Sequence, residues 1–390
     1  MLQLQKSSQP IGQVVKKLGN KVLEKATRWM YRRLGYQLLE KAQTEAFLKP
    51  FQLKVHSAHS LSLPSVVDLI MPQKVYFKAT ETRSEPAFVW SLEASVVAVE
   101  QLPYGGLRTE THLLSTDINI DDLYRNVLHW GKRDVRQVQT LLAPWSHYLD
   151  GIVWGGYYDF VMLVMGKLCR MKDEMHPGEF ASSFVAYPLF DTTYEREFLS
   201  LLGIAPERVI DCRTTKVRAH RCIVANIGHW FYPNLADITS LRRHVLTRLP
   251  PPRGPRNRIY ICRSGRRRVI NEAEIISLLR QYGFQILEDK PRSVAEQVEI
   301  YQNAEFIIGP HGASFVNILW CQPGTYLMEL FAPTYFPDFY RNMAASLHMR
   351  YAAYFHGSAS TADWADGLED NIYVSVKELE QCLHTVLDFF

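Results

Sequence analysis

The stretch Glu305–Asn317, EFIIGPHGASFVN, combines a buried strand, a glycine-bearing turn and the start of a helix. Its apolar run Phe306–Ile308 predicts the strand, and Ser314–Cys321, after the turn Gly309–Ala313, has the pattern of a helix. Glycine lets the backbone approach a ligand closely, and the free N–H groups at a helix start attract anions. The imidazole of His311 can add a hydrogen bond or a proton. The stretch therefore predicts a cradle for a diphosphate-bearing ligand, although the same residues can also form a plain surface turn.

Around this stretch, residues 258–375 alternate regularly between strands and helices. The expected strands are Arg258–Cys262, Phe284–Leu287, Phe306–Ile308, Tyr326–Phe331 and Tyr351–Phe355, and the expected helices are Asn271–Tyr282, Ser293–Asn303 and Phe336–Leu347. Such alternation predicts a doubly wound parallel sheet, whose ligands bind beyond the carboxyl ends of the strands. Ser293 and Glu296 have the spacing of a helix capping box. An amphipathic helix over 376–390 is expected to close the chain.

Charged residues follow the strands of this sheet at the expected binding edge. Arg263 ends the first strand, and Arg266, Arg267 and Arg268 follow it closely. Guanidinium groups match phosphate oxygens and stay charged at any working pH, which makes Arg263 the first candidate. The loop arginines can equally form a solvated basic surface. Glu329 on a later strand can accept hydrogen bonds from a ribose or sugar diol, or can be a structural carboxylate.

The preceding residues, 46–248, are predicted to form a second α/β domain with a strand-rich start. Ala87–Glu100 contains β-branched and aromatic residues without a helical period, and Leu107–Leu114 follows a turn signal as a returning strand. A helix is expected over Asp121–Trp130. Further elements are expected at Ser183–Tyr187 (strand), Thr192–Leu202 (helix) and Arg208–Cys212 (strand). Their alternation favours a parallel sheet here as well.

Two stretches of this half carry more specific predictions. Leu249–Asn257, LPPPRGPRN, cannot continue a helix or a central strand, so residues 249–257 are predicted as the linker between the domains. Gly155–Lys172 is predicted as a turn followed by a mostly apolar, buried helix with Asp159 in its first turn. A carboxylate there is favoured by the helix dipole, and in a cleft it can also act as a general base.

The N-terminal segment, residues 1–45, carries a basic amphipathic helix predicted over Ile11–Ala42. Its apolar residues recur at helical spacing, namely Ile11, Val15, Leu18, Val22, Ala26 and Trp29. Lysines and arginines fill the other face, with Glu24 the only acid between them. Residues 11–42 can lie on an anionic membrane surface. They can equally pack on the rest of the protein with the basic face in water.

Composition and missing motifs exclude several classes of protein. Hydrophobic residues make up 47% of the 390, enough for full cores, and the formal charge of +4 is too small to argue for a nucleic acid partner. The six cysteines include no C-x-x-C pair, which favours reduced thiols over a structural zinc or a redox dithiol. The first residues, MLQLQKSSQP, lack the apolar core of a secretory signal, and no window approaches the roughly 18 apolar residues that cross a bilayer. A cytoplasmic protein, at most peripheral at the inner face of a membrane, is therefore expected.

The sequence also lacks the common cofactor and metal motifs. No G-x-G-x-x-G follows a strand, which counts against a dinucleotide oxidoreductase, and no G-x-x-x-x-G-K-[ST] is present, which counts against ATP hydrolysis. There is no D-x-D pair to hold a metal on a diphosphate. No cofactor and no metal are expected. Stabilisation of a diphosphate would then rest on arginine, histidine, backbone N–H groups and a helix dipole.

On these motifs the C-terminal part resembles the family 61 glycosyltransferases. The matching stretches are RIYICRSGRRRVINEAEI (Arg258–Ile275), LEDKPRSVAEQVEIYQNAEFIIGPHGASFVNILWCQPG (Leu287–Gly324) and MELF (Met328–Phe331). The resemblance implies a GT-B-like α/β fold of two Rossmann-like domains facing a cleft. It implies a nucleotide-sugar donor held mainly by the C-terminal domain and inverting transfer without an essential metal. The donor-site residues that it implies are Arg263, Asn271, Glu272, His311, Gly312, Asn317 and Glu329, to which the arginine loop and the turn add Arg267, Gly309 and Ala313.

The N-terminal half departs from the pattern of that family. The family carries Asn-Tyr-x-His-Trp/Phe followed by an acid and Leu-Pro-Arg, whereas Asp159 stands here at the position of the histidine. Leu163 replaces the acid, and Gly166-Lys167 replaces Pro-Arg. Asp159 and His311 are therefore both candidates for the catalytic base, while His311 can instead only bind the diphosphate.

The predicted function is sugar transfer from a nucleotide-diphosphate sugar to a glycan or a lipid-linked acceptor in surface polysaccharide synthesis, of the capsular type. The altered stretch around Asp159 keeps an alternative open, a catalytically degenerate subunit that binds a nucleotide sugar or serves as a scaffold. A nucleotide-sugar oxidoreductase is disfavoured by the missing glycine motif.

Overall fold

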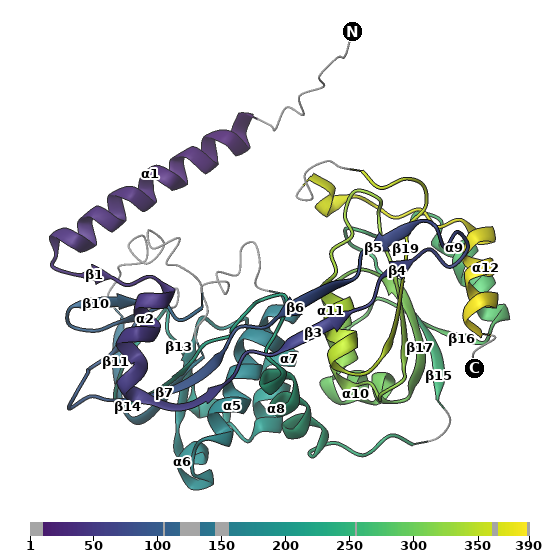
Figure 1. The fold of residues 1–390 in the computed structure, drawn as a ribbon. Helices are drawn as coiled ribbons and strands as arrows, with labels where there is room; N and C mark the ends of the chain where they lie inside the picture. The colour runs from purple at the N-terminus through teal and green to yellow at the C-terminus, as the bar shows by residue number, and fades with distance from the viewer. Residues whose placement is uncertain are drawn as a thin grey trace.

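The computed structural model of the chain describes residues 11–103, 106–117, 133–144, 156–253, 256–360 and 366–387. The expected helix Asp121–Trp130 lies outside the described residues, as do Gly155, part of the linker Leu249–Asn257 and the last residues of the C-terminal helix. The described residues form two α/β halves, each built around a sheet with parallel strands (Figure 1).

The C-terminal half is a five-stranded, all-parallel sheet in the order β16-β15-β17-β18-β19. Its strands are β15 (Asn257–Ile261), β16 (Phe284–Leu287), β17 (Ala304–Pro310), β18 (Tyr326–Leu330) and β19 (Arg350–Tyr354). The strand order reverses between β15 and β17, because β16 lies on one side of β15 and the later strands add on the other. Ligands of such sheets bind at this reversal.

Helices cover both faces of this sheet, as the alternating sequence predicted. On one face, α9 (Glu272–Gln281) and α12 (Val376–Leu387) pack with Phe306 and Ile308. On the other face, α10, η4 and α11 pack with Ile307. These elements span Val294–Gln302, Ala313–Trp320 and Phe339–Ser346. The predicted capping box at the start of α10 is present. The helix expected after the turn is also present, but η4 is a 3-10 helix that begins one residue earlier, at Ala313.

The N-terminal half is built on a six-stranded sheet in the order β13-β12-β11-β14-β7-β2. Its strands are β2 (Gln52–His56), β7 (Ala87–Glu93), β11 (Asp134–Ala143), β12 (Phe184–Tyr187), β13 (Val209–Asp211) and β14 (Thr215–Ala225). The four strands from β11 to β14 are parallel, and β7 is antiparallel to β14. The sequence analysis missed the two long strands β11 and β14, because their first residues are polar and partly exposed and give no continuous apolar signal.

The buried helix predicted over Gly155–Lys172 is confirmed as one helical run. It consists of α4 (Tyr157–Asp159), the π-helical segment η2 (Phe160–Met165) and α5 (Gly166–Asp173). Every residue of the π-helical segment is buried. The described residues of this half also form α6 (Pro177–Ser182), α7 (Thr193–Leu202), η3 (Pro206–Arg208) and α8 (Leu235–Leu246).

The N-terminal helix is shorter than predicted. α1 spans Ile11–Arg33 and ends before Gly35, whose φ of 90° places it in the left-handed region that terminates helices. A short strand, β1 (Gln37–Leu38), and a second helix, α2 (Lys41–Leu48), follow. The prediction of one helix over Ile11–Ala42 was therefore wrong in its second part, because a glycine in this conformation stops the helical ladder.

Two expected strands of the N-terminal half also differ from the structure. The strand predicted over Ala87–Glu100 ends at Glu93, and the strand predicted over Leu107–Leu114 is split in two. The pieces join a separate four-stranded sheet, whose members are β1, β8 (Glu100–Gln101), β9 (Leu107–Arg108) and β10 (His112–Leu114). These predictions were wrong because tertiary pairing with β1 decides where the short strands begin and end.

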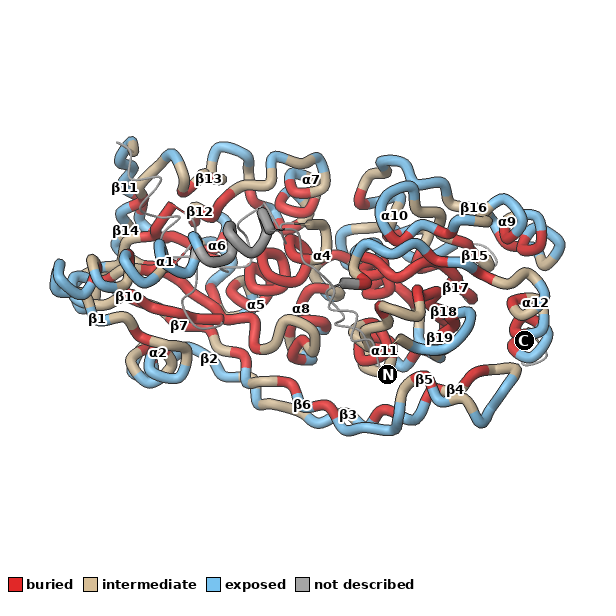
Figure 2. Tube along the Cα trace, turned by 90° about the horizontal axis from the view of Figure 1, so that it is seen from above, coloured by how far each residue is buried: buried red, intermediate tan, exposed pale blue. Residues whose placement is uncertain are grey.

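A two-stranded arm, residues 57–86, leaves the N-terminal sheet between β2 and β7 and reaches across to the C-terminal half (Figures 1 and 2). Its ladders pair β3 with β6 and β4 with β5. The strands span Ser60–Leu63, Val66–Val67, Val75–Phe77 and Thr80–Arg83. The arm is therefore a second connection between the halves, besides the linker.

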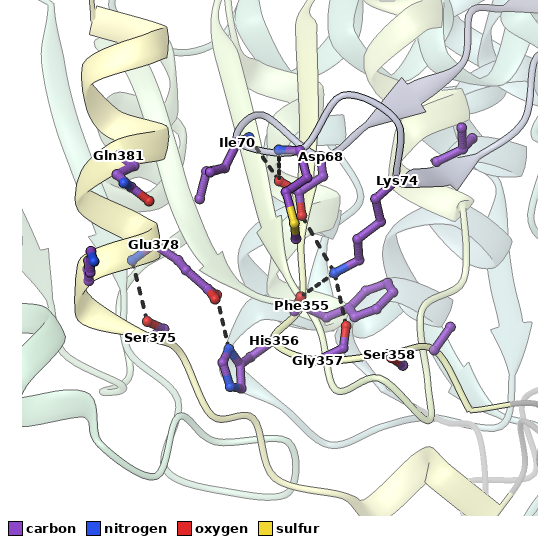
Figure 3. Close-up of a pocket in the computed structure, with 14 residues that line it drawn as sticks. Asp68, Ile70, Lys74, Phe355, His356, Gly357, Ser358, Ser375, Glu378 and Gln381 are labelled. Carbon is purple, nitrogen blue, oxygen red and sulfur yellow. Dashed lines mark hydrogen bonds and ion pairs between the residues drawn. The ribbon is translucent and has the colours of Figure 1, made fainter.

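The tip of the arm is anchored on the end of β19 (Figure 3). The Nζ of Lys74 donates a hydrogen bond to the backbone oxygen of Gly357 at 2.9 Å and lies 4.6 Å from the ring centroid of Phe355. The ring of Tyr76 also lies 4.6 Å from that of Phe355. Further along the arm, the Nη2 of Arg341 donates to the backbone oxygens of Leu63, Pro64 and Lys78. These contacts hold the arm against the C-terminal half.

A continuous apolar core joins the two halves (Figure 2). Val161 and Phe198 from the N-terminal half belong to the same buried cluster as Val316 and Trp320 from the C-terminal half. The ring centroids of Phe198 and Trp320 lie 6.2 Å apart. Within the part of the chain that the structure describes, none of the helices combines the length and the apolar character that a membrane span requires.

Candidate functional site

The carboxyl edge of the C-terminal sheet brings together predicted residues from two strands. Arg263 follows β15 and His311 follows β17, on the two sides of the point where the strand order reverses. Parallel strands present their carboxyl ends at one edge, so the residues that follow them meet there. The Nη1 of Arg263 donates a hydrogen bond to the backbone oxygen of His311 at 2.8 Å.

A cavity of about 680 Å³ opens at this edge. Its wall is formed by the loops after β15 and β16, by α10 and by the start of η4, and Tyr157 and Tyr194 close it from the N-terminal half. Of the predicted residues, Arg263, Ala313 and Asn317 lie on this wall. The volume is in the range of small-molecule and cofactor sites, which suits a ligand the size of a nucleotide sugar.

Two arginines form a partly buried cationic pair beside the cavity. Burial, together with the charges of Arg267 and Arg266, lowers the pKa of Arg263 to about 10. Burial also lowers the pKa of Arg267. Within the described residues, neither guanidinium has a carboxylate at ion-pair distance, whereas the neighbouring Arg266 pairs with Glu369. Within the described residues the two guanidinium groups therefore have no ion-pair partner, although Asp289 and Glu369 act on them from a longer distance, and an anion bound there would be favoured.

The backbone of Arg267 supports the same interpretation. This residue adopts a φ of 59°, a conformation uncommon outside glycine, and only 7% of it is exposed. Its Nη1 donates to the backbone oxygen of Leu368 at 3.0 Å, and its guanidinium lies 5.1 Å from the ring centroid of Tyr335. Its Nε is buried without a hydrogen-bond partner. A buried unsatisfied donor costs free energy, and it is a common feature of sites that await a ligand.

His311 belongs to a hydrogen-bonded chain of three side chains. Its Nδ1 lies 2.8 Å from Oε1 of Glu329, whose Oε2 accepts a hydrogen bond from the hydroxyl of Tyr351 at 2.6 Å. Because a carboxylate only accepts, Nδ1 carries the proton and Nε2 keeps its lone pair. Burial lowers the pKa of His311, against the opposing effect of Glu329. The imidazole is thus held neutral and in one tautomer, the form that a general base needs.

The glycines of the turn are required by close packing. A Cβ added to Gly312 would lie 1.6 Å from the Nη1 of Arg263, so only glycine lets this guanidinium lie across the turn. A Cβ on Gly309 would lie 3.1 Å from the Cβ and the backbone oxygen of Ile261, between β15 and β17. Gly312 has an extended φ of 176°, which any residue can adopt. Because these glycines have no side chain, neighbouring groups can pack closely at the carboxyl edge of the C-terminal sheet.

Asn317 connects the cavity wall to the N-terminal half. Its Oδ1 accepts hydrogen bonds from the hydroxyl of Tyr157 at 2.8 Å and from the Nε1 of Trp320 at 2.9 Å. Its Nδ2 donates to the Oε1 of Gln297 at 2.9 Å. The amide is 2% exposed and fully engaged, so it fixes the position of the two halves relative to each other at the mouth of the cavity.

Asp159 is engaged in the N-terminal half. Its Oδ2 accepts a hydrogen bond from the backbone N–H of Gly156 at 3.1 Å, and its Oδ1 accepts one from the Nε1 of Trp230 at 3.0 Å. The residue is 4% exposed. Asp159 lies in the first turn of the helical run, as predicted, where it caps the backbone N–H of Gly156 and also anchors Trp230.

Comparison with known proteins adds the family. The model of the glycosyltransferase 61 family matches residues 118–328. This chain belongs to the glycosyltransferase 61 family. Membership of this family supports glycosyltransferase activity. The matched residues include Arg263 and His311. No curated protein matches the chain.

Several solved structures match this family member. They include a dodecameric iron-containing heptosyltransferase, TibC, in complex with ADP-D-beta-D-heptose, at 8% identity and a TM-score of 0.29. That match covers 79% of this chain and 81% of the other. At this similarity the match carries no argument about the present site.

Most residues predicted for the donor site do not themselves line the cavity, namely Gly309, His311, Gly312, Arg267, Asn271, Glu272 and Glu329. The side chain of Asn271 exchanges two hydrogen bonds with the backbone of Val374. The Oε1 of Glu272 accepts one from the hydroxyl of Tyr260 at 3.1 Å. Glu329 is fully buried, and both its oxygens are taken by His311 and Tyr351. In this structure Asn271, Glu272 and Glu329 hold neighbouring segments of the C-terminal half in place through these hydrogen bonds.

The departures from the family pattern in the N-terminal half are buried. Leu163 is fully enclosed in the apolar core. Lys167, which stands where the family has arginine, is fully buried, and its Nζ donates to the Oδ2 of Asp117 at 2.7 Å. Both therefore occupy structural positions in this glycosyltransferase.

The sequence analysis missed an aromatic loop, His229–Tyr232, after the long strand β14. The ring of Phe231 stacks on that of Phe339 with centroids 4.0 Å apart, and the hydroxyl of Tyr232 donates to Asp338 at 2.9 Å. The ring of Phe339 lies in turn 6.0 Å from that of His311. The run HWFYPN directly after an apolar strand end was the available signal, since aromatic residues at a strand's carboxyl end often line sites.

Proposed function

We propose that this protein transfers a sugar from a nucleoside-diphosphate sugar to a hydroxyl group of a glycan or a lipid-linked glycan, in the synthesis of a surface polysaccharide such as a capsule. The cationic pair Arg263 and Arg267 is the observation that carries the proposal. Two partly buried guanidinium groups that repel each other, and that form no ion pair within the described residues, match the charge and geometry of a diphosphate. The adjoining cavity would hold the rest of the donor.

The proposed arrangement is GT-B-like, with two Rossmann-like domains on either side of the donor. Both sheets have parallel strands, and the strand order reverses between β11 and β14 in one and between β15 and β17 in the other. Tyr157, after β11, touches Asn317, and Phe231, after β14, touches Phe339. These contacts support a site shared by the two carboxyl edges. The boundary of the two domains at residues 249–257 is part of this proposal.

His311 is the proposed base. In the step that we propose, the Nε2 of His311 takes the proton of an acceptor hydroxyl. The oxygen of that hydroxyl forms a bond to the anomeric carbon as the bond from that carbon to the diphosphate oxygen breaks. Attack from the opposite face inverts the configuration. Asp159 is the weaker candidate, since its two oxygens already accept hydrogen bonds from Trp230 and Gly156.

The leaving diphosphate gains negative charge as the bond breaks. Arg263 and Arg267 are already held by the backbone oxygens of His311 and Leu368, so they need little rearrangement to stabilise that charge. Because the two arginines can stabilise the diphosphate, we propose that the transfer needs no metal ion. Among the described residues, no group of three or more His, Cys, Asp or Glu side chains is placed to share an ion.

Titration calorimetry with UDP, GDP, CDP and their sugars, in Mg²⁺ and separately in EDTA, tests the donor site. We expect one nucleotide class to bind in both conditions, and Arg263→Ala to lose that binding. A ligand at about 100 times its dissociation constant should also raise the free energy of unfolding by about 2.7 kcal/mol. If no nucleotide binds, or if binding requires the metal, the proposal of a metal-free diphosphate site fails.

Turnover of the identified donor then separates an enzyme from a scaffold. Release of the nucleoside diphosphate should depend on His311 and should persist in Asp159→Asn, provided that the variant keeps its fold. Loss of turnover in Asp159→Asn with His311→Asn still active would move the base to Asp159. Binding without turnover by the wild-type protein, under conditions that supply glycan and lipid-linked acceptors, would favour the degenerate scaffold.

A further inference from the structure

The second half of the N-terminal helix α1, from Lys21 to Arg33, has exposed apolar residues on the side away from the protein. Figure 1 shows that the helix projects from the body, with its C-terminal end beside β1. Thr27 and Tyr31 are 7% and 1% exposed, and Tyr31 packs with Leu102 and Leu113. An α-helix makes one turn in about 3.6 residues, so Trp29, two positions from each, lies on the opposite side. The inner face of α1 is therefore defined by Thr27 and Tyr31.

An apolar stripe faces solvent on the other side. Val22 is 63% exposed and Trp29 is 62% exposed, and Ala26 lies between them, also exposed. We call Val22, Ala26 and Trp29 the outer stripe. These residues belong to the apolar series that the sequence placed on one helical face, and the fold leaves this part of the face open. Exposed apolar residues grouped in this way mark an interaction surface.

Positive charge borders the outer stripe. The exposed lysines and arginines beside it are Lys21, Lys25, Arg32 and Arg33. The guanidinium of Arg33 lies 5.4 Å from the ring centroid of Trp29. The nearby acid, Glu24, accepts a hydrogen bond from Arg28 at 2.8 Å, on the side toward the body. The stripe thus has an apolar centre with a tryptophan and a basic border, the pattern of helices that lie in the interface of an anionic bilayer.

We propose that α1 docks this protein on an anionic membrane surface through the outer stripe, with the basic border on the lipid headgroups. A second copy of the chain would bring an identical basic border against this one, and the like charges would repel, so the charge pattern favours lipid phosphates. The proposal does not depend on catalysis, and its test uses no nucleotide, so it can fail or stand independently of the proposed function.

Vesicle co-sedimentation of the full-length protein tests the proposal. We expect binding to vesicles of phosphatidylcholine with phosphatidylglycerol and at least tenfold weaker binding to phosphatidylcholine alone. Binding should weaken as salt is raised, because the headgroup attraction is screened. Equal binding to both vesicle types, or no binding to either, would overturn the proposal.

Two variants locate the contact. Val22→Ser with Trp29→Ser should reduce binding about tenfold or more, because the outer stripe loses its apolar area. The matched control, Val96→Ser with Val135→Ser, changes valines that are 69% and 55% exposed elsewhere and should bind as the wild type does. Equal loss in both would show that the stripe is not the contact.

The border is tested by neutralising its four cations to glutamine. Each cation near an anionic surface contributes roughly a fivefold gain in binding, so the combined variant should lose more than 100-fold. Lys49→Gln with Lys54→Gln is the control, since both lysines are exposed on another surface. Sedimentation velocity of the same proteins completes the test. A dimer that disappears in the stripe variant, without vesicle binding by the wild type, would assign the stripe to a second copy and refute membrane docking.

Discussion

The buried cations of the two halves differ in whether the protein compensates them. In the N-terminal half, Arg170 is fully buried, and its Nε donates to the Oδ1 of Asp237 at 2.5 Å. Lys167 is buried against Asp117 in the same way. At the edge of the C-terminal sheet, Arg263 and Arg267 are partly buried, donate hydrogen bonds to backbone oxygens, and form no ion pair within the described residues.

This difference separates a structural charge from one that awaits a ligand. A buried ion pair is costly to break, because removal of one partner leaves the other uncompensated. An uncompensated cation is costly to keep, and the fold gains little from it. The N-terminal pairs therefore stabilise the fold, whereas the C-terminal pair is the one that we propose to bind an anion. The predictions below start from this contrast.

The largest effect is expected for Arg170→Ala. The variant leaves the carboxylate of Asp237 buried without its cation, and burial already raises the pKa of Asp237 against the effect of Arg170. The free energy of unfolding should fall by about 3–5 kcal/mol, measured by urea denaturation. The double variant Arg170→Met with Asp237→Leu should recover much of the loss. A loss of free energy of unfolding below about 1 kcal/mol in Arg170→Ala would show that the buried ion pair of the N-terminal half is not needed for the fold.

Arg263→Ala should show the reverse behaviour. We expect the free energy of unfolding to change by less than about 1 kcal/mol, because no buried carboxylate loses a partner. The dissociation constant of the nucleoside diphosphate should rise about 100-fold, in line with loss of charge-assisted hydrogen bonds. Calorimetry and denaturation of the same preparation measure both. Severe destabilisation with unchanged nucleotide affinity would show that Arg263 is structural.

Glu329→Gln tests the histidine that lies beside the cationic pair. Glutamine cannot hold His311 in one tautomer, so kcat should fall about 10- to 100-fold. Glu329 raises the pKa of His311 in opposition to burial, so its neutralisation should lower that pKa further. Activity is lost on the acid side as His311 becomes protonated, and the acid limb of the pH–kcat profile should therefore move to lower pH. An unmoved limb would mean that His311 does not titrate in catalysis.

The smallest effect is expected for Gly312→Ala. The new Cβ would occupy the position of the Nη1 of Arg263, and this flexible side chain should swing away while the fold stays intact. Nucleotide affinity should fall about tenfold with a change of less than about 1 kcal/mol in stability. Gly178→Ala is the control, because its nearest atom would lie 3.5 Å from the added Cβ. Equal nucleotide affinity in both variants would separate Arg263 from the ligand.

The sequence by itself determined the elements of the C-terminal half. Apolar runs bounded by turn residues marked all five of its strands, because a parallel sheet covered on both faces needs continuous apolar strands. The same reasoning placed Arg263 and His311 at one edge, since the carboxyl ends of parallel strands share an edge. It was less accurate for β11, β14 and the short strands after β7, where exposed polar residues hide the pattern and pairing with distant segments sets the bounds.

Only the tertiary structure decided how the charged residues are used. The sequence alone does not distinguish the roles of the basic residues Arg263, Lys167 and Arg170. Whether each of them contacts a carboxylate depends on residues far away in the chain, such as Asp117 and Asp237. The fold likewise decides that Glu329 contacts His311. It also decides that Asp159 accepts hydrogen bonds from the backbone N–H of Gly156 and the indole of Trp230. The outward direction of the stripe on α1 was likewise set by which face met the small sheet. Local sequence patterns determine whether a segment forms a helix or a strand. Whether a side chain is buried, and whether its charge is compensated, depends on neighbours that only the folded chain brings together.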